Sequence, residues 1–136
     1  MTRFEERLLA SGKVSAEDLR KVQRVQQERG EPLERLLTEL GFMSEDDLLV
    51  VLAEHYHAPI VSARDFPQEP PVIAGINPGF FRQARLCPLA IQDGQLTVAM
   101  ADPGDLYVLE AMEKASGLRL VLRLARERDI LDALNS

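Results

Sequence analysis

Two histidines and two aspartates are the residues of this chain whose types and spacing could support metal or acid–base chemistry. His55 and His57 lie two residues apart, so on a helix they point to different sides and do not form a zinc pair. Asp102 and Asp105 stand between an expected strand and an expected helix, where α/β proteins often place sites, and two carboxylates there could hold a metal. The interpretation we favour for both pairs is structural. Histidines suit a helix C-terminus, and aspartates suit turns and helix caps.

Nucleotide hydrolysis is not expected of this chain. A phosphate-binding loop needs a lysine after a spaced pair of glycines, and none of Lys13, Lys21 and Lys114 has that context. No Ser, Cys or Asp stands in a recognisable triad context with either histidine. Cys87 is the single cysteine, so it cannot form an internal disulfide, and we expect it to be a buried thiol. The prediction is a chain without catalytic residues, without a metal and without a cofactor of its own.

Charge and composition exclude several classes of protein. A net charge of −6 and a pI near 4.9 argue against nucleic-acid binding, which needs a basic surface. Up to Arg35 there are eight basic and seven acidic residues, whereas residues 36–58 contain five acids and no Lys or Arg, so anion binding is conceivable only in the first part. Arg20 and Arg24, one helical turn apart beside Lys21, either face an anionic partner or form a solvated helix face. No apolar run approaches a membrane span or a secretory signal, and we expect a cytoplasmic location.

An internal repeat organises the first part of the chain, where these arginines and the two histidines lie. Gly12–Leu19 returns 29 residues later as Gly41–Leu48, which pairs Leu8 with Leu37, Leu19 with Leu48 and Val22 with Val51. Each copy predicts a short helix, a glycine turn, a serine cap and a second helix. The four helices are expected from Arg3 to about Ala10, from Ser15 to Gly30, from Pro32 to Gly41 and from Ser44 onward.

The second half has a different texture. Residues 66–71 are rich in proline, and Asn77-Pro78 begins a short helix through about Ala84. Asp93-Gly94 between two apolar runs predicts a hairpin, with Pro88 placing the first strand at a sheet edge. A helix, a strand of alternating character over 118–124 and a last helix complete the pattern. The fold class is therefore α+β: tandem helical hairpins over 1–58, a linker and short helix over 59–84, and a three-stranded lobe over 85–136 with its helices on one face.

This order of elements resembles a known family. The residues that carry the resemblance are Ala58-Pro59-Ile60-Val61, Leu86-Cys87-Pro88-Leu89 and Val98-Ala99-Met100-Ala101-Asp102-Pro103. The chain looks like the amino-terminal domain of type II secretion and type IV pilus assembly ATPases. The resemblance implies a hexameric motor whose catalytic domains, which bind ATP and Mg²⁺, would follow Ser136.

Two functions come with the resemblance. The first is docking onto the cytoplasmic domain of an inner-membrane platform protein, so that the chain meets the membrane only through its partner. The second is binding of cyclic di-GMP through an Arg-Leu-Gly start, a central Gly and a terminal Gln in each repeat, with apolar residues around the bases. The positions that match this pattern, and that would form the site, are Arg3, Leu8, Gly12, Gln26, Leu33 and Gly41.

Departures from the ligand pattern decide between these functions. Phe4 and Glu5 replace the Leu and Gly of the first copy, while Pro32, Glu34 and His55 replace the Arg, Gly and Gln of the second. A carboxylate in place of glycine fills the space near a ligand and repels phosphate. The sequence therefore favours docking, with cyclic di-GMP binding as the alternative.

Overall fold

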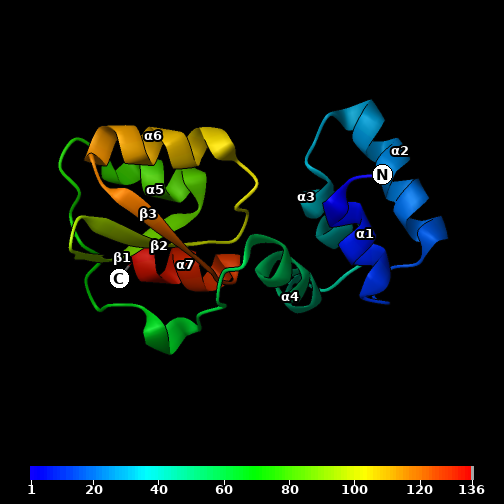
Figure 1. The fold of residues 1–136 in the computed structure, drawn as a ribbon, viewed down its shortest axis with the longest axis horizontal. Coiled ribbons are helices and arrows are strands. Elements are labelled where there is room, and N and C mark those ends of the chain that lie inside the picture. The colour runs from blue at the N-terminus through cyan, green and yellow to red at the C-terminus, as the bar shows by residue number, and fades with distance from the viewer. Residues whose placement is uncertain (136) are drawn as a thin grey trace. The chain divides into compact units, whose positions relative to one another are not determined.

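The computed structural model describes residues 1–135, which form two compact units, unit 1 over Met1–His57 and unit 2 from Ala58 onward (Figure 1). Unit 1 consists of four helices, α1 (Arg3–Ala10), α2 (Ala16–Arg29), α3 (Leu33–Glu39) and α4 (Glu45–Tyr56). The two predicted helical hairpins are confirmed.

Local sequence signals set the helix ends in unit 1. Thr2 forms a capping box with Glu5, and the hydroxyls of Ser15 and Ser44 accept hydrogen bonds from the Asp18 and Asp47 amides at 3.1 Å. Pro32 differs slightly from its expected place. It is the extended residue just before α3, where its ring holds φ at a value suited to the start of a helix but offers no side-chain cap.

The repeat explains which side chains of unit 1 are buried. Leu8, Leu19 and Val22 of the first copy are all buried, and so are their counterparts Leu37, Leu48 and Val51 in the second. Helix α1 packs against α4, and α3 packs against both α2 and α4. Each copy therefore buries the apolar stripe of the other, as stacked repeats do.

Unit 2 is built on a three-stranded sheet in the order β1-β2-β3. Strands β1 (Leu86–Gln92) and β2 (Gln95–Met100) are antiparallel and joined by Asp93-Gly94, whereas β3 (Arg119–Leu124) runs parallel to β2. Helix α6 (Leu106–Ser116) makes the crossover between the parallel strands. Pro88 lies on an edge strand beside a register shift, as its missing amide predicts.

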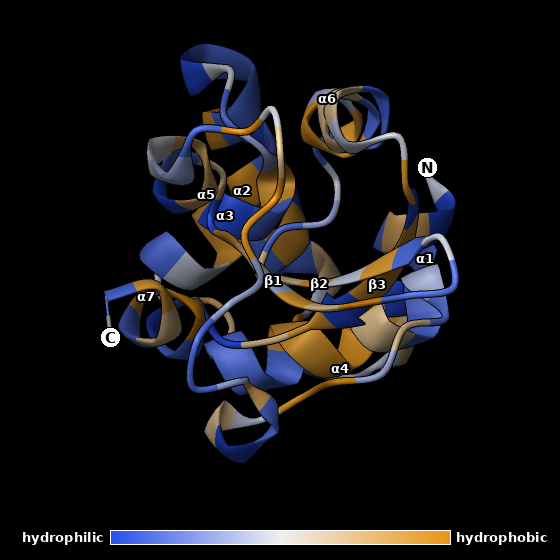
Figure 2. Cartoon of the chain, turned by 90° about the vertical axis from the view of Figure 1, so that its left-hand side faces the viewer, coloured by the Kyte–Doolittle hydropathy of each residue, from blue (hydrophilic) through white to orange (hydrophobic). Residues whose placement is uncertain are grey.

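Helices cover both faces of this sheet, so the expectation of helices on one face was wrong. Strand residues that alternate in direction separate two clusters: Leu96 and Val98 pack toward α5 (Pro78–Ala84) and α6, while Cys87 and Ala99 pack toward α7 (Glu127–Asn135). Figure 1 shows α5 and α6 on one side of the strands and α7 on the other. Figure 2 shows a hydrophobic and a hydrophilic side on both α6 and α7.

The proline-rich segment is part of unit 2. Phe66, at its start, packs partly buried against the cluster on the α7 side, and Ile73, just after it, is buried in the cluster with α5 and α6. The 3-10 helix η1 (Ala63–Asp65), just before it, packs against α7. Proline prevents a continuous helix here, but Phe66 and Ile73 at its two ends still pack against the core. No helix within residues 1–135 is both long enough and apolar enough to cross a bilayer.

Candidate functional site

The six residues predicted to bind a ligand occupy very different environments. Arg3 is exposed in the first turn of α1, and Gln26 is half-buried on α2. Gly12 and Gly41 both have positive φ, at 73° and 80°, and an added Cβ would meet nothing within 4 Å at either position. The glycines are therefore required by the turns and leave open space around them.

Leu8 and Leu33 are committed to packing. Their side chains are 0% and 6% exposed, on α1 and at the start of α3. Apolar residues that embrace a base need an accessible face, and these two offer almost none. The structure thus brings the six residues into one unit without giving all six a common surface.

Glu5, expected from the sequence to stand in place of a glycine, has a structural role. Its carboxylate accepts a hydrogen bond from the Thr2 amide at 3.0 Å and another from the Gln23 side chain of α2. These bonds, chiefly the one to the Thr2 backbone, hold the pKa of Glu5 below its ordinary value. Position 5 is therefore a fixed negative charge that joins α1 to α2.

The charges of Arg3 and Arg7 on α1 act on His55 of α4. The Phe4 and His55 rings meet edge to face, 5.4 Å between centroids. Burial lowers the pKa of His55, and the charges of Arg7, Arg3 and His57 lower it further. Within residues 1–135 the Arg7 Nε and His55 Nδ1 atoms are buried and have no hydrogen-bond partner. Arg7 was not predicted, although its spacing one turn after Arg3 was a usable signal.

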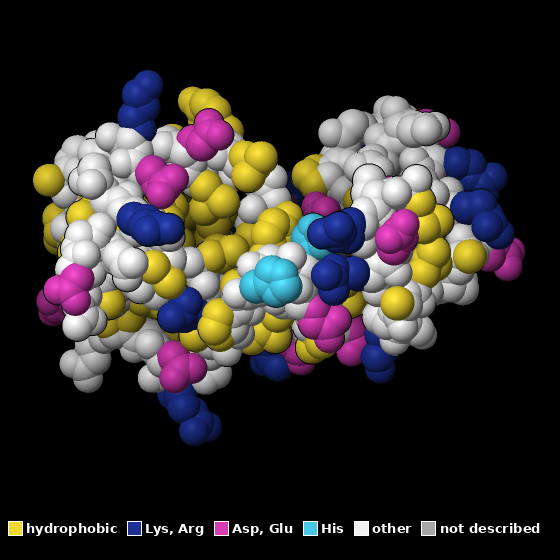
Figure 3. All heavy atoms as spheres, viewed as in Figure 1, with side chains coloured by type: hydrophobic (Ala, Val, Ile, Leu, Met, Phe, Trp, Pro, Cys, Tyr) yellow, Lys and Arg dark blue, Asp and Glu magenta, His cyan; other side chains and the backbone are white. Residues whose placement is uncertain are grey.

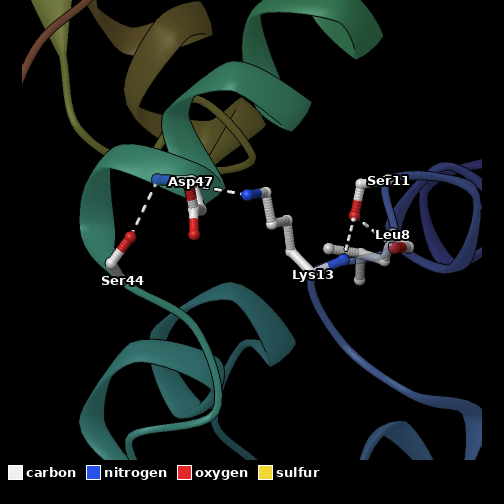
Figure 4. Close-up of polar contacts among 5 residues, drawn as sticks. All are labelled: Leu8, Ser11, Lys13, Ser44 and Asp47. Carbon is white, nitrogen blue, oxygen red and sulfur yellow. Dashed lines mark hydrogen bonds and ion pairs between the residues drawn. The ribbon is translucent and has the colours of Figure 1, made fainter.

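A hollow of about 340 Å³ lies between α1 and α4. Lys13 Nζ and Asp47 Oδ1 approach to 3.9 Å across it, and Figure 4 shows Ser11 accepting from the Lys13 amide on one side and Ser44 capping Asp47 on the other. Its lining carries both signs of charge, which does not favour a phosphate diester. The lining residues are Arg7, Ala10, Ser11, Lys13, Asp47, Val50, Val51 and Glu54.

A second hollow of about 340 Å³ lies on the surface of α2, lined by Arg20, Gln23, Arg24 and Gln27. Lys21, beside these arginines, has an ion pair with Asp18 at 3.7 Å. In the described part of the chain no carboxylate lies within ion-pair distance of Arg20 or Arg24. This face offers two free guanidinium groups and the Gln27 amide to a partner, whereas the Gln23 amide already donates to Glu5.

The residues considered for metal chemistry have structural roles. The Asp102 carboxylate accepts from the Gly104 amide at 3.3 Å, and the Asp105 carboxylate caps α6 at the Val108 amide. His57 ends α4 in a left-handed conformation, φ 53°. Among residues 1–135 no three His, Cys, Asp or Glu side chains come together as metal ligands.

Comparison with known proteins shows which family and which relatives this chain resembles. Residues 56–136 match the MshEN domain. The chain is 35% identical to the type II secretion system protein E of Xanthomonas campestris pathovar campestris over 98% of its length, and 26% identical to the type IV pilus assembly ATPase PilB of Myxococcus xanthus over 97%. It covers only 24% and 23% of these relatives, about a quarter of each.

Two solved structures share the fold of the whole chain. The N-terminal domain of XpsE is 36% identical with a TM-score of 0.84, over 98% of this chain and 92% of that one. MshE with cdg is 25% identical with a TM-score of 0.83, over 99% of this chain and 98% of that one. The chain thus shares its architecture, a helical repeat followed by a small α/β unit, with the N-terminal domain of XpsE and with MshE. The chain belongs to the MshEN domain family, which confirms the resemblance inferred from the sequence.

Proposed function

We propose that this chain is the docking domain of a type II secretion ATPase, without catalysis of its own, and that it binds the cytoplasmic domain of an inner-membrane platform protein. The observation that carries the proposal is its similarity to a type II secretion protein E over 98% of the chain. In the whole protein, a hexameric motor would bind ATP and Mg²⁺ in other domains. The motor would lie in the cytoplasm and meet the membrane through the platform protein.

The surface of unit 1 supports a protein partner. Arg20 and Arg24 on α2 are exposed and without ion pairs in the range described, and Gln23 and Gln27 stand beside them. Arginines with free guanidinium groups are enriched where proteins meet, because they make planar hydrogen-bonded pairs with carboxylates. We assign the docking contact to this face of α2.

A binding measurement tests the docking proposal. The purified chain is titrated with the cytoplasmic domain of the platform protein. The double variant R20E/R24E should weaken binding about tenfold or more, because each substitution leaves a carboxylate of the partner unpaired and facing a like charge. The control is R128E on α7, an exposed arginine of unit 2 that should bind as the unchanged chain does. Absence of binding under conditions where the full motor binds would refute the proposal.

Cyclic di-GMP binding is the second candidate function, favoured by the cations Arg3 and Arg7 beside His55. Two guanidinium groups one helical turn apart suit a phosphate diester. The charge of Glu5 and the burial of Leu8 and Leu33 oppose it. Calorimetry with cyclic di-GMP is the test: no heat at high micromolar ligand eliminates this function, whereas heat that R3A/R7A abolishes would establish it.

A further inference from the structure

Strand β3 has an outer edge that is only partly covered. Its C-terminal residue, Leu124, pairs with the start of unit 2: the Leu124 amide donates to Pro59 O at 2.9 Å, and the Val61 amide donates to Leu124 O at 2.8 Å. Alternate residues of a strand direct their backbone groups to the same side. Leu120 and Leu122 therefore direct theirs to this same edge, beyond the reach of Pro59.

Two of the four backbone groups on Leu120 and Leu122 are covered by side chains. The Leu120 amide donates to Glu113 Oε2 at 3.3 Å, and Arg123 Nη1 donates to Leu122 O at 3.1 Å. The Leu120 carbonyl and the Leu122 amide have no protein partner in the part of unit 2 that the structure describes. One free acceptor and one free donor thus flank Val121.

The side chains along this edge differ between the two faces of the sheet. On one side Leu120 and Leu122 are only half-buried and, like Leu109 of α6, pack against the cluster between the sheet and α6. Figure 3 shows hydrophobic side chains exposed between α6 and β3. On the other side stand Arg119 and Arg123, and no carboxylate of the described chain lies within ion-pair distance of either.

We propose that the outer edge of β3 binds an extended segment of another protein, in which an acidic residue stands between two apolar residues. A residue opposite Val121 shares its side of the sheet, so an acidic side chain there lies between Arg119 and Arg123. Its two neighbours point to the other side, toward Leu120 and Leu122, which requires apolar side chains. The backbone of the segment donates to the Leu120 carbonyl and accepts from the Leu122 amide, as in strand addition generally.

The side chains of Glu113 and Arg123 can protect this edge while no segment is bound. Uncovered edges pair indiscriminately with other chains, and charged residues on the edge limit this. Both side chains are exposed or half-exposed, so a segment can displace them, and Arg123 then meets the acidic residue. This proposal goes beyond platform docking, because the site lies in unit 2 and its occupant is defined by its own sequence pattern.

The test uses a synthetic peptide, acetyl-Gly-Thr-Val-Glu-Val-Thr-Gly-amide, and the intact chain. Binding is followed by the backbone NMR signals of the chain, and the Leu122 amide should shift most. In a parallel pairing the N–H of the central glutamate reaches the Leu120 carbonyl, and in an antiparallel pairing the N–H of the following valine does. Two further peptides carry an N-methyl group at one or the other of these positions, which removes that N–H. One of these two peptides should bind about tenfold more weakly.

Charge exchange gives an independent measurement. The variant R119E/R123E should bind the glutamate peptide about tenfold more weakly, and it should prefer a peptide with lysine in place of glutamate. Equal binding of all the peptides, or no shift at β3 up to millimolar peptide, would overturn the proposal. The N-methylated peptides use the unchanged protein, so the conclusion does not depend on how the variant folds.

Discussion

Glu5 shows how one residue can change the chemistry of a repeat. A glycine at this position would leave the start of α1 open, whereas the Glu5 carboxylate closes a capping box with Thr2 and bonds Gln23. The second copy carries Glu34 at the corresponding position. Both copies thus hold a carboxylate at this position, and a carboxylate repels phosphate.

The low pKa of His55 predicts a dependence of stability on pH. Unfolded histidine takes up a proton near pH 6.5, but burial and the charges of Arg7 and Arg3 disfavour the proton in the folded chain. Stability from this source is therefore complete above pH 6.5 and is lost as the pH falls through the lowered pKa of the folded state.

Urea denaturation at pH 7.5 and 5.5 measures this effect. Both values lie above the ordinary pKa of Glu5, 4.5, so its titration contributes little. The unchanged chain should lose more stability between the two conditions than H55Q, whose side chain does not titrate. An equal loss in both proteins would show that His55 is not responsible.

The serine caps make a second prediction at this scale. S44A should lower the free energy of unfolding by about 1 kcal/mol, because the Asp47 amide loses the hydroxyl that accepts from it at 3.1 Å. S15A should cost a similar amount, since the Asp18 amide depends on Ser15 in the same way. S44N keeps a side-chain acceptor and should stay close to the original stability in the same denaturation experiment. A loss in S44N as large as in S44A would exclude the capping explanation.

Among the elements, the β1–β2 hairpin depends most directly on two residues. Asp93 and Gly94 have φ values of 53° and 75°, as the primed turn of a two-residue hairpin requires. An added Cβ at Gly94 would meet nothing within 4 Å, so only backbone strain opposes a substitution.

G94A should therefore destabilise the chain by about 1 kcal/mol. D93N should have little effect, because asparagine adopts the left-handed conformation readily. Thermal melting of both variants measures the difference. Equal melting temperatures for G94A and the unchanged chain would contradict the strain argument.

Helix α7 is the element whose position could not be predicted. Its apolar residues, such as Ile130, could pack on either face of a sheet, and the strand pattern does not specify which face α7 covers. Small side chains decide the position. Cys87 and Ala99 on the α7 side allow a close approach, whereas Leu96 and Val98 on the other side meet α5 and α6.

At the scale of the whole molecule, each unit buries its own apolar residues. The two clusters of unit 2 lie within its own strands, helices and proline-rich segment. A fragment of residues 58–136 should therefore fold without unit 1. Circular dichroism should show its sheet and helices, with a cooperative thermal transition.

Cys87 reports on the fold of this fragment. Burial raises the pKa of its thiol to about 11, so at pH 8 only about one molecule in a thousand carries the reactive thiolate. A thiol reagent should label the fragment slowly, and rapidly after urea is added. Immediate labelling without urea would show that the sheet does not form alone.

The sequence by itself determined the elements of this protein, because their signals are local. Ser15 and Ser44, the glycines at 12 and 41, the Asp93-Gly94 turn and the family motifs each act within a few residues of the chain. Only the tertiary structure decided which side chains meet. The contact of Glu5 with Gln23, the action of the Arg7 charge on His55 and the two-sided cover of the sheet join residues far apart in sequence, and no local pattern specifies such packing.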